Sequence, residues 1–96
     1  MPTFIMLSTL TDDGAETVKE NPDRIRQVRE ELEQQFGIRV LAQYAVLGPY
    51  DFVNIIEAPD IETAARVSAE MAARGSVKIQ TLAAIPVDEF IARLKG

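Results

Sequence analysis

Cysteine, histidine and tryptophan are all absent from this sequence of 96 residues. The absence of cysteine excludes disulfides, thiolate nucleophiles and cysteine-based metal sites. The absence of histidine removes the commonest general base, the commonest metal ligand and the usual proximal haem ligand. The acidic pairs Asp12-Asp13 and Asp88-Glu89 stand at expected helix starts, where the helix dipole already accounts for carboxylates. We therefore expect no metal site and no cofactor.

Positive charge is also scarce. The chain has 10 Lys and Arg against 15 Asp and Glu, which gives a net charge of −5. A nucleic-acid partner is not expected, because phosphate binding needs a basic patch. The apolar run near the N-terminus follows no basic leader and is far too short to span a bilayer. We expect a cytoplasmic protein that contacts no membrane.

Hydrophobic residues are plentiful, at 47% of the chain, which predicts a packed core rather than disorder. A length of 96 residues predicts one domain, spanning residues 1–96. A domain of this size buries a limited fraction of its surface, and small domains often gain core by association.

The pattern of apolar residues predicts four strands, at residues 3–10, 39–47, 52–57 and 76–85. Helical segments are expected at residues 12–20 and 22–36, separated at Pro22, then at residues 60–75, with a short helix after Pro86. Gly48-Pro49 lies between two strand-like runs and predicts a hairpin turn. In the segment 22–36 an apolar stripe is expected to face the core, opposite a solvated charged face with the pairs Arg26–Glu30 and Arg29–Glu33.

The order of these segments is βαββαβ with a C-terminal helix. Right-handed crossovers place both main helices on one face of a four-stranded antiparallel sheet. The simplest solution is an α+β fold of the ferredoxin-like type with the spatial strand order 4-1-3-2.

The helices of such a fold leave the second face of the sheet open. That face is largely apolar here, since the first strand is apolar on both sides and the third places Val53 and Ile55 away from Phe52 and Ile56. Only the C-terminal helix could cover it from within the chain, and this helix is too short for four strands. A bare face would be a larger apolar patch than a monomer normally shows. We expect a homo-oligomer, at least a dimer, formed by sheet-on-sheet packing.

The run from Leu47 to Val53, Leu-Gly-Pro-Tyr-Asp-Phe-Val, followed by Ile-Glu-Ala-Pro-Asp at residues 56–60, resembles the GYD-domain family. The resemblance covers nearly the whole chain and implies a protein of the dimeric α/β-barrel type that assembles through its sheet. The segment 46–85 resembles more loosely the effector-binding domain of leucine-responsive regulators, through its Gly-Pro-Tyr-Asp hairpin and the strand Gly-Ser-Val-Lys-Ile-Gln-Thr at residues 75–81. Those domains bind small molecules at subunit interfaces. The DNA-binding helices of those regulators are absent.

Six residues are candidates for a ligand site. Tyr50 and Asp51 follow the hairpin turn, where turn chemistry alone also accounts for them. Asn54, Lys78 and Gln80 interrupt apolar strands, and buried polar groups are unfavourable unless paired. We expect Lys78 and Gln80 on one face and Asn54 joined to them across the central strand. Tyr44, the last of the six, or Gln43 could complete the rim. Such a cleft suits a small anionic or carbonyl-bearing metabolite. The same residues also fit hydrogen bonds between subunits, or simple exposure of Lys78 at the sheet edge.

Two classes of function remain, with a purely structural assembly unit as a third. The first is an oligomeric small-molecule-binding or regulatory module. The second is a cofactor-independent oxygenase or isomerase of the dimeric α/β-barrel type. Without histidine or cysteine, an enzyme would depend on Lys78, a tyrosine or a buried acid such as Glu57, none of which titrates near neutral pH in its ordinary state. The first class is therefore favoured, and catalysis is not expected.

Overall fold

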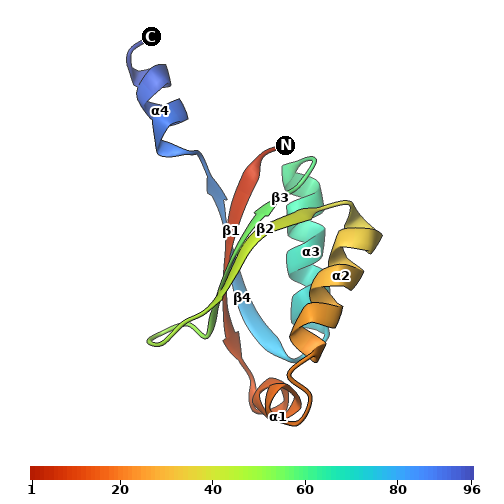
Figure 1. The fold of residues 1–96 in the computed structure, drawn as a ribbon. Coiled ribbons are helices and arrows are strands. Elements are labelled where there is room, and N and C mark those ends of the chain that lie inside the picture. The colour runs from red at the N-terminus through yellow and green to blue at the C-terminus, as the bar shows by residue number, and fades with distance from the viewer.

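The computed structural model describes all 96 residues (Figure 1). The elements in chain order are β1 (Thr3–Leu10), α1 (Asp12–Glu20), α2 (Arg24–Phe36), β2 (Arg39–Ala45), β3 (Phe52–Glu57), α3 (Ile61–Ala73), β4 (Val77–Ala84) and α4 (Val87–Leu94). These bounds match the expected segments closely. The differences are of one or two residues: β2 and α3 each end two residues early, at Ala45 and Ala73, and α2 begins two residues late, at Arg24.

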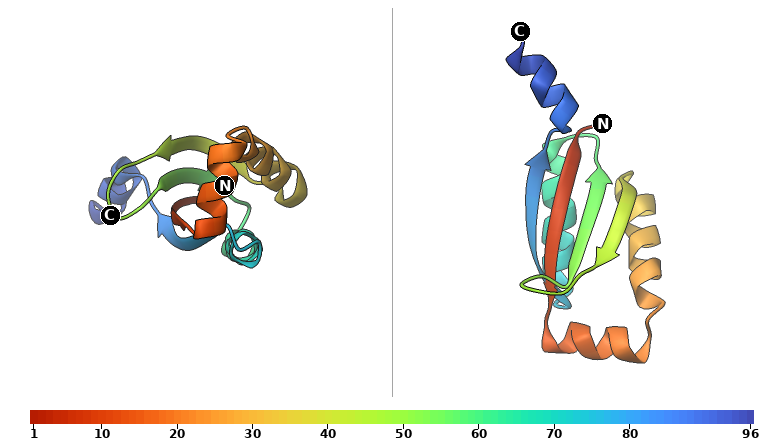
Figure 2. Two further views of the ribbon diagram at one scale, coloured as in Figure 1. Left: turned by 90° about the horizontal axis from the view of Figure 1, so that it is seen from below. Right: turned by 60° about the vertical axis from the view of Figure 1, so that its left-hand side comes forward.

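The four strands form one antiparallel sheet in the order β2-β3-β1-β4. This order confirms the ferredoxin-like arrangement predicted from the sequence, with β1 at the centre. Helices α2 and α3 both lie on one face of the sheet (Figure 2). The other face is not covered by any helix of the chain, and we call it the open face.

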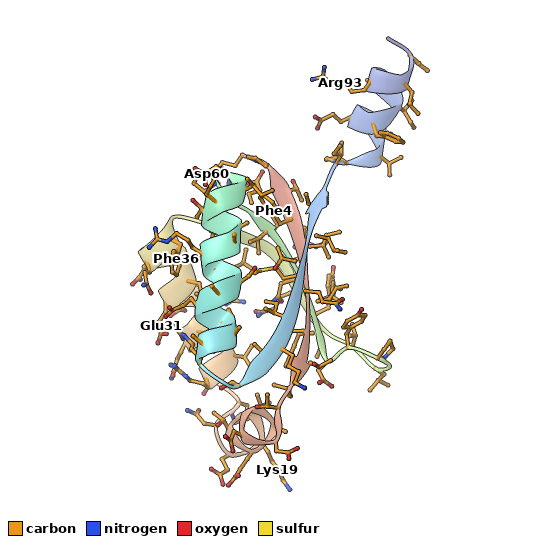
Figure 3. The ribbon with its side chains drawn as sticks, turned by 180° about the vertical axis from the view of Figure 1, so that it is seen from behind. Phe4, Lys19, Glu31, Phe36, Asp60 and Arg93 are labelled. Atoms are coloured by element: carbon orange, nitrogen blue, oxygen red, sulfur yellow. The ribbon has the colours of Figure 1, made fainter.

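Local chemistry explains where the helices begin and end. The Thr11 hydroxyl accepts a hydrogen bond from the Gly14 amide at 3.1 Å and caps α1. Asp60 caps α3 by accepting from the Thr63 amide at 2.7 Å (Figure 3). Gly37 ends α2 with a φ of 67°, a left-handed conformation that glycine adopts without steric cost. Pro22 separates α1 from α2 completely, so α1 lies across the end of the sheet rather than beside α2 (Figure 2).

The core lies between the sheet and the helices. Phe4, Met6 and Ile56 project from the sheet toward α3, whose Ala64 and Val67 are almost fully buried. Alanine at such positions lets a helix approach a sheet closely. Helix α2 contributes a single buried residue, Leu32, as its share of the same core. The two helices thus pack unequally, and α2 leaves space beneath it.

Helix α4 projects beyond the sheet and has no buried residue (Figure 1). Its side chains, Arg93 among them, lie clear of the rest of the chain (Figure 3). The exposed apolar residues of this arm are Ile85, Val87, Phe90, Ile91 and Leu94. The arm leaves the open face bare, as expected. None of the helices has the length and apolar character needed to cross a membrane.

Candidate functional site

Apolar side chains run in rows across the open face. Because Phe4, Met6 and Ser8 are buried under the helices, the alternate residues of β1 project the other way. Ile5 is one of these, and it lies opposite Ile55 on β3 and Leu82 on β4, which makes a continuous apolar row. The predicted apolar second face is therefore present. Leu82 leaves 48% of its surface exposed there.

The next row carries polar groups at both of its ends. Leu7 lies opposite Val53 and Gln80, and Val53 in turn lies opposite Tyr44, which is 58% exposed. The loop between β2 and β3 projects from the open side of the sheet (Figure 1). From this loop the Tyr50 hydroxyl donates to Gln80 Oε1 at 3.0 Å.

Lys78 lies next along β4, opposite Thr9, and is exposed at the edge of the sheet. The pairing of Lys78 with Gln80 on one face is thus confirmed. With Tyr44 and Tyr50 these two residues share the open side of the sheet, so four of the six predicted residues lie on one side of the molecule.

Asp51 holds the end of β1 in place. Its Oδ2 accepts from the Leu10 amide at 2.7 Å, and its own amide donates to the Ser8 carbonyl at 2.8 Å. The sequence suggested bonds within the turn, whereas the main carboxylate bond joins the turn to a strand 41 residues away. Asp51 therefore has a structural role that the expected ligand site does not require.

Replacement of Asp51 by alanine is expected to lower the free energy of unfolding by about 1–2 kcal/mol, because the part-buried Leu10 amide loses its acceptor. Urea unfolding followed by circular dichroism measures the change. Asp51→Asn, whose amide oxygen still accepts a hydrogen bond, serves as the control and should lose less. Equal stability of Asp51→Ala and the parent protein would contradict this role.

Asn54 lies on the opposite face of the sheet from Lys78 and Gln80. It is paired with Met6, and Met6 is paired on its other side with Thr81, so these residues project toward the helices. The expectation that Asn54 joins Lys78 and Gln80 across β1 is therefore wrong. In this register Asn54 lies level with Thr81 of β4, one residue away from Gln80. A step of one residue along a strand moves a side chain to the other face.

Asn54 instead faces a cavity of about 500 Å³ beneath α2. The sheet forms one wall, α2 forms another, and Gly14, Thr17 and Val18 of α1 close one end. Of its 22 lining residues 12 are hydrophobic, so the lining is mixed with an apolar majority. Asn54 Oδ1 is buried and has no hydrogen-bond partner. The cavity was not foreseen from the sequence.

An ion-pair network borders this cavity. Glu31 on α2 pairs with Arg24 and with Arg74, both at 2.9 Å, and so links α2 to the end of α3. The hydrogen bonds from Arg74 and then Arg24 hold the pKa of Glu31 below its ordinary value. The predicted pairs Arg26–Glu30 and Arg29–Glu33 do not form, because Arg26 meets Asp23 and the Glu33 carboxylate accepts from the Val40 amide at 3.0 Å.

Arg29 was expected on the solvated face of α2, but it lies at the cavity. It lines the cavity and donates to Gln43 Oε1 at 3.3 Å. Its position four residues after Ile25 and three before Leu32 puts it on the apolar stripe of α2, and this spacing is the signal that could have identified it. No group of three or more carboxylates is placed to hold a metal ion.

Proteins of known name are similar to this chain in sequence or in fold. The chain is 67% identical over 95 residues to the "Glutamine synthetase and cystathionine beta-lyase binding protein" of Thermus thermophilus, and the match covers 99% of this chain and 100% of that protein. Two crystal structures are similar at the level of the fold. MtbAldR has a TM-score of 0.66 and 19% identity over 88% of this chain, which spans about half (52%) of MtbAldR.

The second structure, FFRP-DM1, has a TM-score of 0.59 and 21% identity over 88% of this chain and all (100%) of that one. Both structures contain effector-binding domains of the leucine-responsive type, which confirms the looser resemblance in fold. The model of the GYD domain matches residues 4–94, and this range includes the Gly-Pro-Tyr-Asp turn and the Glu-Ala-Pro-Asp helix start. The chain belongs to the GYD domain family.

Proposed function

We propose that this chain is a homo-oligomeric binding module that regulates metabolic enzymes by direct contact, with glutamine synthetase and cystathionine beta-lyase as its partners. The observation that carries the oligomeric part of the proposal is the open face, an apolar surface that no helix of the chain covers. The name of the Thermus thermophilus relative, at 67% identity, supplies the partner enzymes. A contiguous exposed apolar surface is typical of proteins that work by association.

A second copy of the chain is the occupant that suits the open face best. Two sheets pack face to face at about 10 Å, and the row of Ile5, Ile55 and Leu82 supplies apolar groups for such a contact. The apolar side of α4 extends beyond the sheet, where it would reach the neighbouring copy rather than its own chain. The open face and α4 thus both leave apolar surface in water when the chain is alone, and a second copy could cover both.

Tyr44, Tyr50, Lys78 and Gln80 would lie at the border of this contact. Tyrosine is enriched where protein surfaces meet, and polar groups are typical of the rim. The ligand-binding role predicted for these residues remains a prediction. A metabolite held at such a seam would have to compete with the bond between Tyr50 and Gln80.

The test of the proposed function is direct binding between purified proteins. Glutamine synthetase and cystathionine beta-lyase from the same organism are each titrated with this chain in a calorimeter. Saturable binding with a dissociation constant in the micromolar range or tighter is expected for at least one enzyme. An unrelated acidic protein of similar size, substituted for this chain, controls for charge. Absence of binding to both enzymes at about 100 μM would contradict the proposal.

A further inference from the structure

The cavity beneath α2 is too large to be a packing defect. Protein interiors contain few voids larger than a water molecule, whereas pockets that bind small ligands measure about 300–1,000 Å³. The value of about 500 Å³ falls in the second class. Its lining residues come from the sheet, α1, α2 and the end of α3, so the space is part of the fold.

Three polar side chains, two from the sheet and one from α2, line the same part of the cavity. Asn54 on β3 lies directly opposite Gln43 on β2, and Gln43 accepts a hydrogen bond from Arg29 at 3.3 Å. Asn54 Oδ1 is buried without a partner. A buried acceptor of this kind normally has a donor, from the protein, from water or from a ligand. This part of the cavity therefore offers a free hydrogen-bond acceptor, Asn54 Oδ1, and a positively charged group, Arg29.

Arg29 is the cation of the cavity that no carboxylate neutralises. Arg24 and Arg74 also line the space, but both are bound to Glu31. Arg29 takes part in none of the ion pairs, and its neighbour Gln43 is neutral. A guanidinium in a partly buried, mostly apolar space is a strong site for a carboxylate, because a charge-assisted hydrogen bond is roughly twice as strong as a neutral one.

The apolar residues that line the rest of the cavity indicate that the remainder of the ligand is apolar. Ile25, Val28 and Leu32 of α2 line the cavity together with Met6 and Ile56 of the sheet. An apolar group placed between them would be removed from water. We infer that the cavity binds a small carboxylic acid with a compact apolar body, its carboxylate on Arg29 and a hydroxyl or amino donor on Asn54 Oδ1. This inference does not depend on the proposed enzyme partners.

Mandelate, phenylacetate and phenylethylene glycol test this assignment as a matched set. Mandelate has the carboxylate, the apolar ring and the donor; phenylacetate lacks the donor, and phenylethylene glycol lacks the carboxylate. In calorimetric titrations of the full chain, mandelate should bind most tightly. Phenylacetate should bind several-fold more weakly, and the glycol at least about tenfold more weakly. Absence of saturable binding of both acids at about 10 mM would overturn the inference.

Two variants assign the binding to the named residues. Arg29→Met should weaken mandelate binding by at least about tenfold, whereas Arg26→Met, an exposed residue of the same helix, should leave it unchanged. Asn54→Leu should abolish the preference for mandelate over phenylacetate. Equal loss in both arginine variants would indicate general charge attraction and would contradict the assignment.

A measurement on the unmodified protein keeps the inference testable if a variant fails to fold. In methyl NMR spectra, mandelate should shift the signals of Ile25, Val28 and Leu32 in the cavity. Signals of Val53 and Leu82 on the open face should not move. The opposite pattern would place the ligand on the open face and overturn the cavity site, and this outcome leaves the test of enzyme binding unaffected.

Discussion

The substitution Ile55→Asp is expected to dissociate the assembly into folded monomers, whereas Ile56→Asp, at the adjacent position, is expected to unfold the chain. Ile55 projects from β3 onto the open face, in the row with Ile5 and Leu82. A carboxylate there would be well hydrated in a monomer but would be trapped without a partner between two sheets. The substitution therefore acts against association far more than against folding.

Ile56 is 1% exposed and belongs to the core cluster beneath α3. An unpaired charge at a fully buried site costs several kcal/mol, and a domain is stable by only about 5–15 kcal/mol in total. Sedimentation measures the mass of each variant, and circular dichroism measures its folding. If Ile55→Asp keeps the mass of the parent protein, the open face is not the contact. A folded Ile56→Asp would show that the faces of β3 are wrongly assigned.

A single methyl group at Gly14 is expected to destabilise the protein by at least about 2 kcal/mol, since overpacking of a well-packed site typically costs about 1–3 kcal/mol. A Cβ at this position would lie 1.9 Å from the backbone oxygen of Ser76. That oxygen has little freedom to move, because it accepts from the Thr11 amide at 3.0 Å and the Thr11 hydroxyl binds the neighbouring Gly75 carbonyl at 2.7 Å. Helix α1 would have to shift away from β4.

The sign of the stability change in Gly14→Ala distinguishes the effect of tight packing from that of intrinsic helix propensity. Helix propensity alone predicts that Gly14→Ala stabilises α1 by about 1 kcal/mol. The control, Ala15→Gly, changes an exposed position of the same helix and should lose only about that amount through propensity. Chemical denaturation of both variants gives the two values. A more stable Gly14→Ala variant would show that α1 does not press against the start of β4.

The strands and their order could be predicted because their signals are local. Residues 3–10 and 52–57 are apolar runs bounded by turn residues, and the structure places β1 and β3 at the same positions. The capping residue Asp60 and the stop at Gly37 follow from side-chain and backbone chemistry in the same way. The order of the strands follows from the handedness of the crossovers.

The position of Asn54 relative to Lys78 and Gln80 could not be fixed by alternation alone. Alternation within a strand assigns two faces, but the match of faces between β3 and β4 depends on the register that each makes with β1. The cavity depends on the distance between α2 and the sheet, which is a property of tertiary packing. Arg29 was assigned to solvent for the same reason, although its position on the apolar stripe of α2 pointed inward.

The mass of the unmodified protein in solution tests the central claim most directly, which is that the open face is a contact between copies of this chain. One chain has a mass of 10.6 kDa. Sedimentation velocity at micromolar concentration should give at least twice that value, with little change on tenfold dilution. A single species with the mass of one chain, at every concentration, would contradict the account.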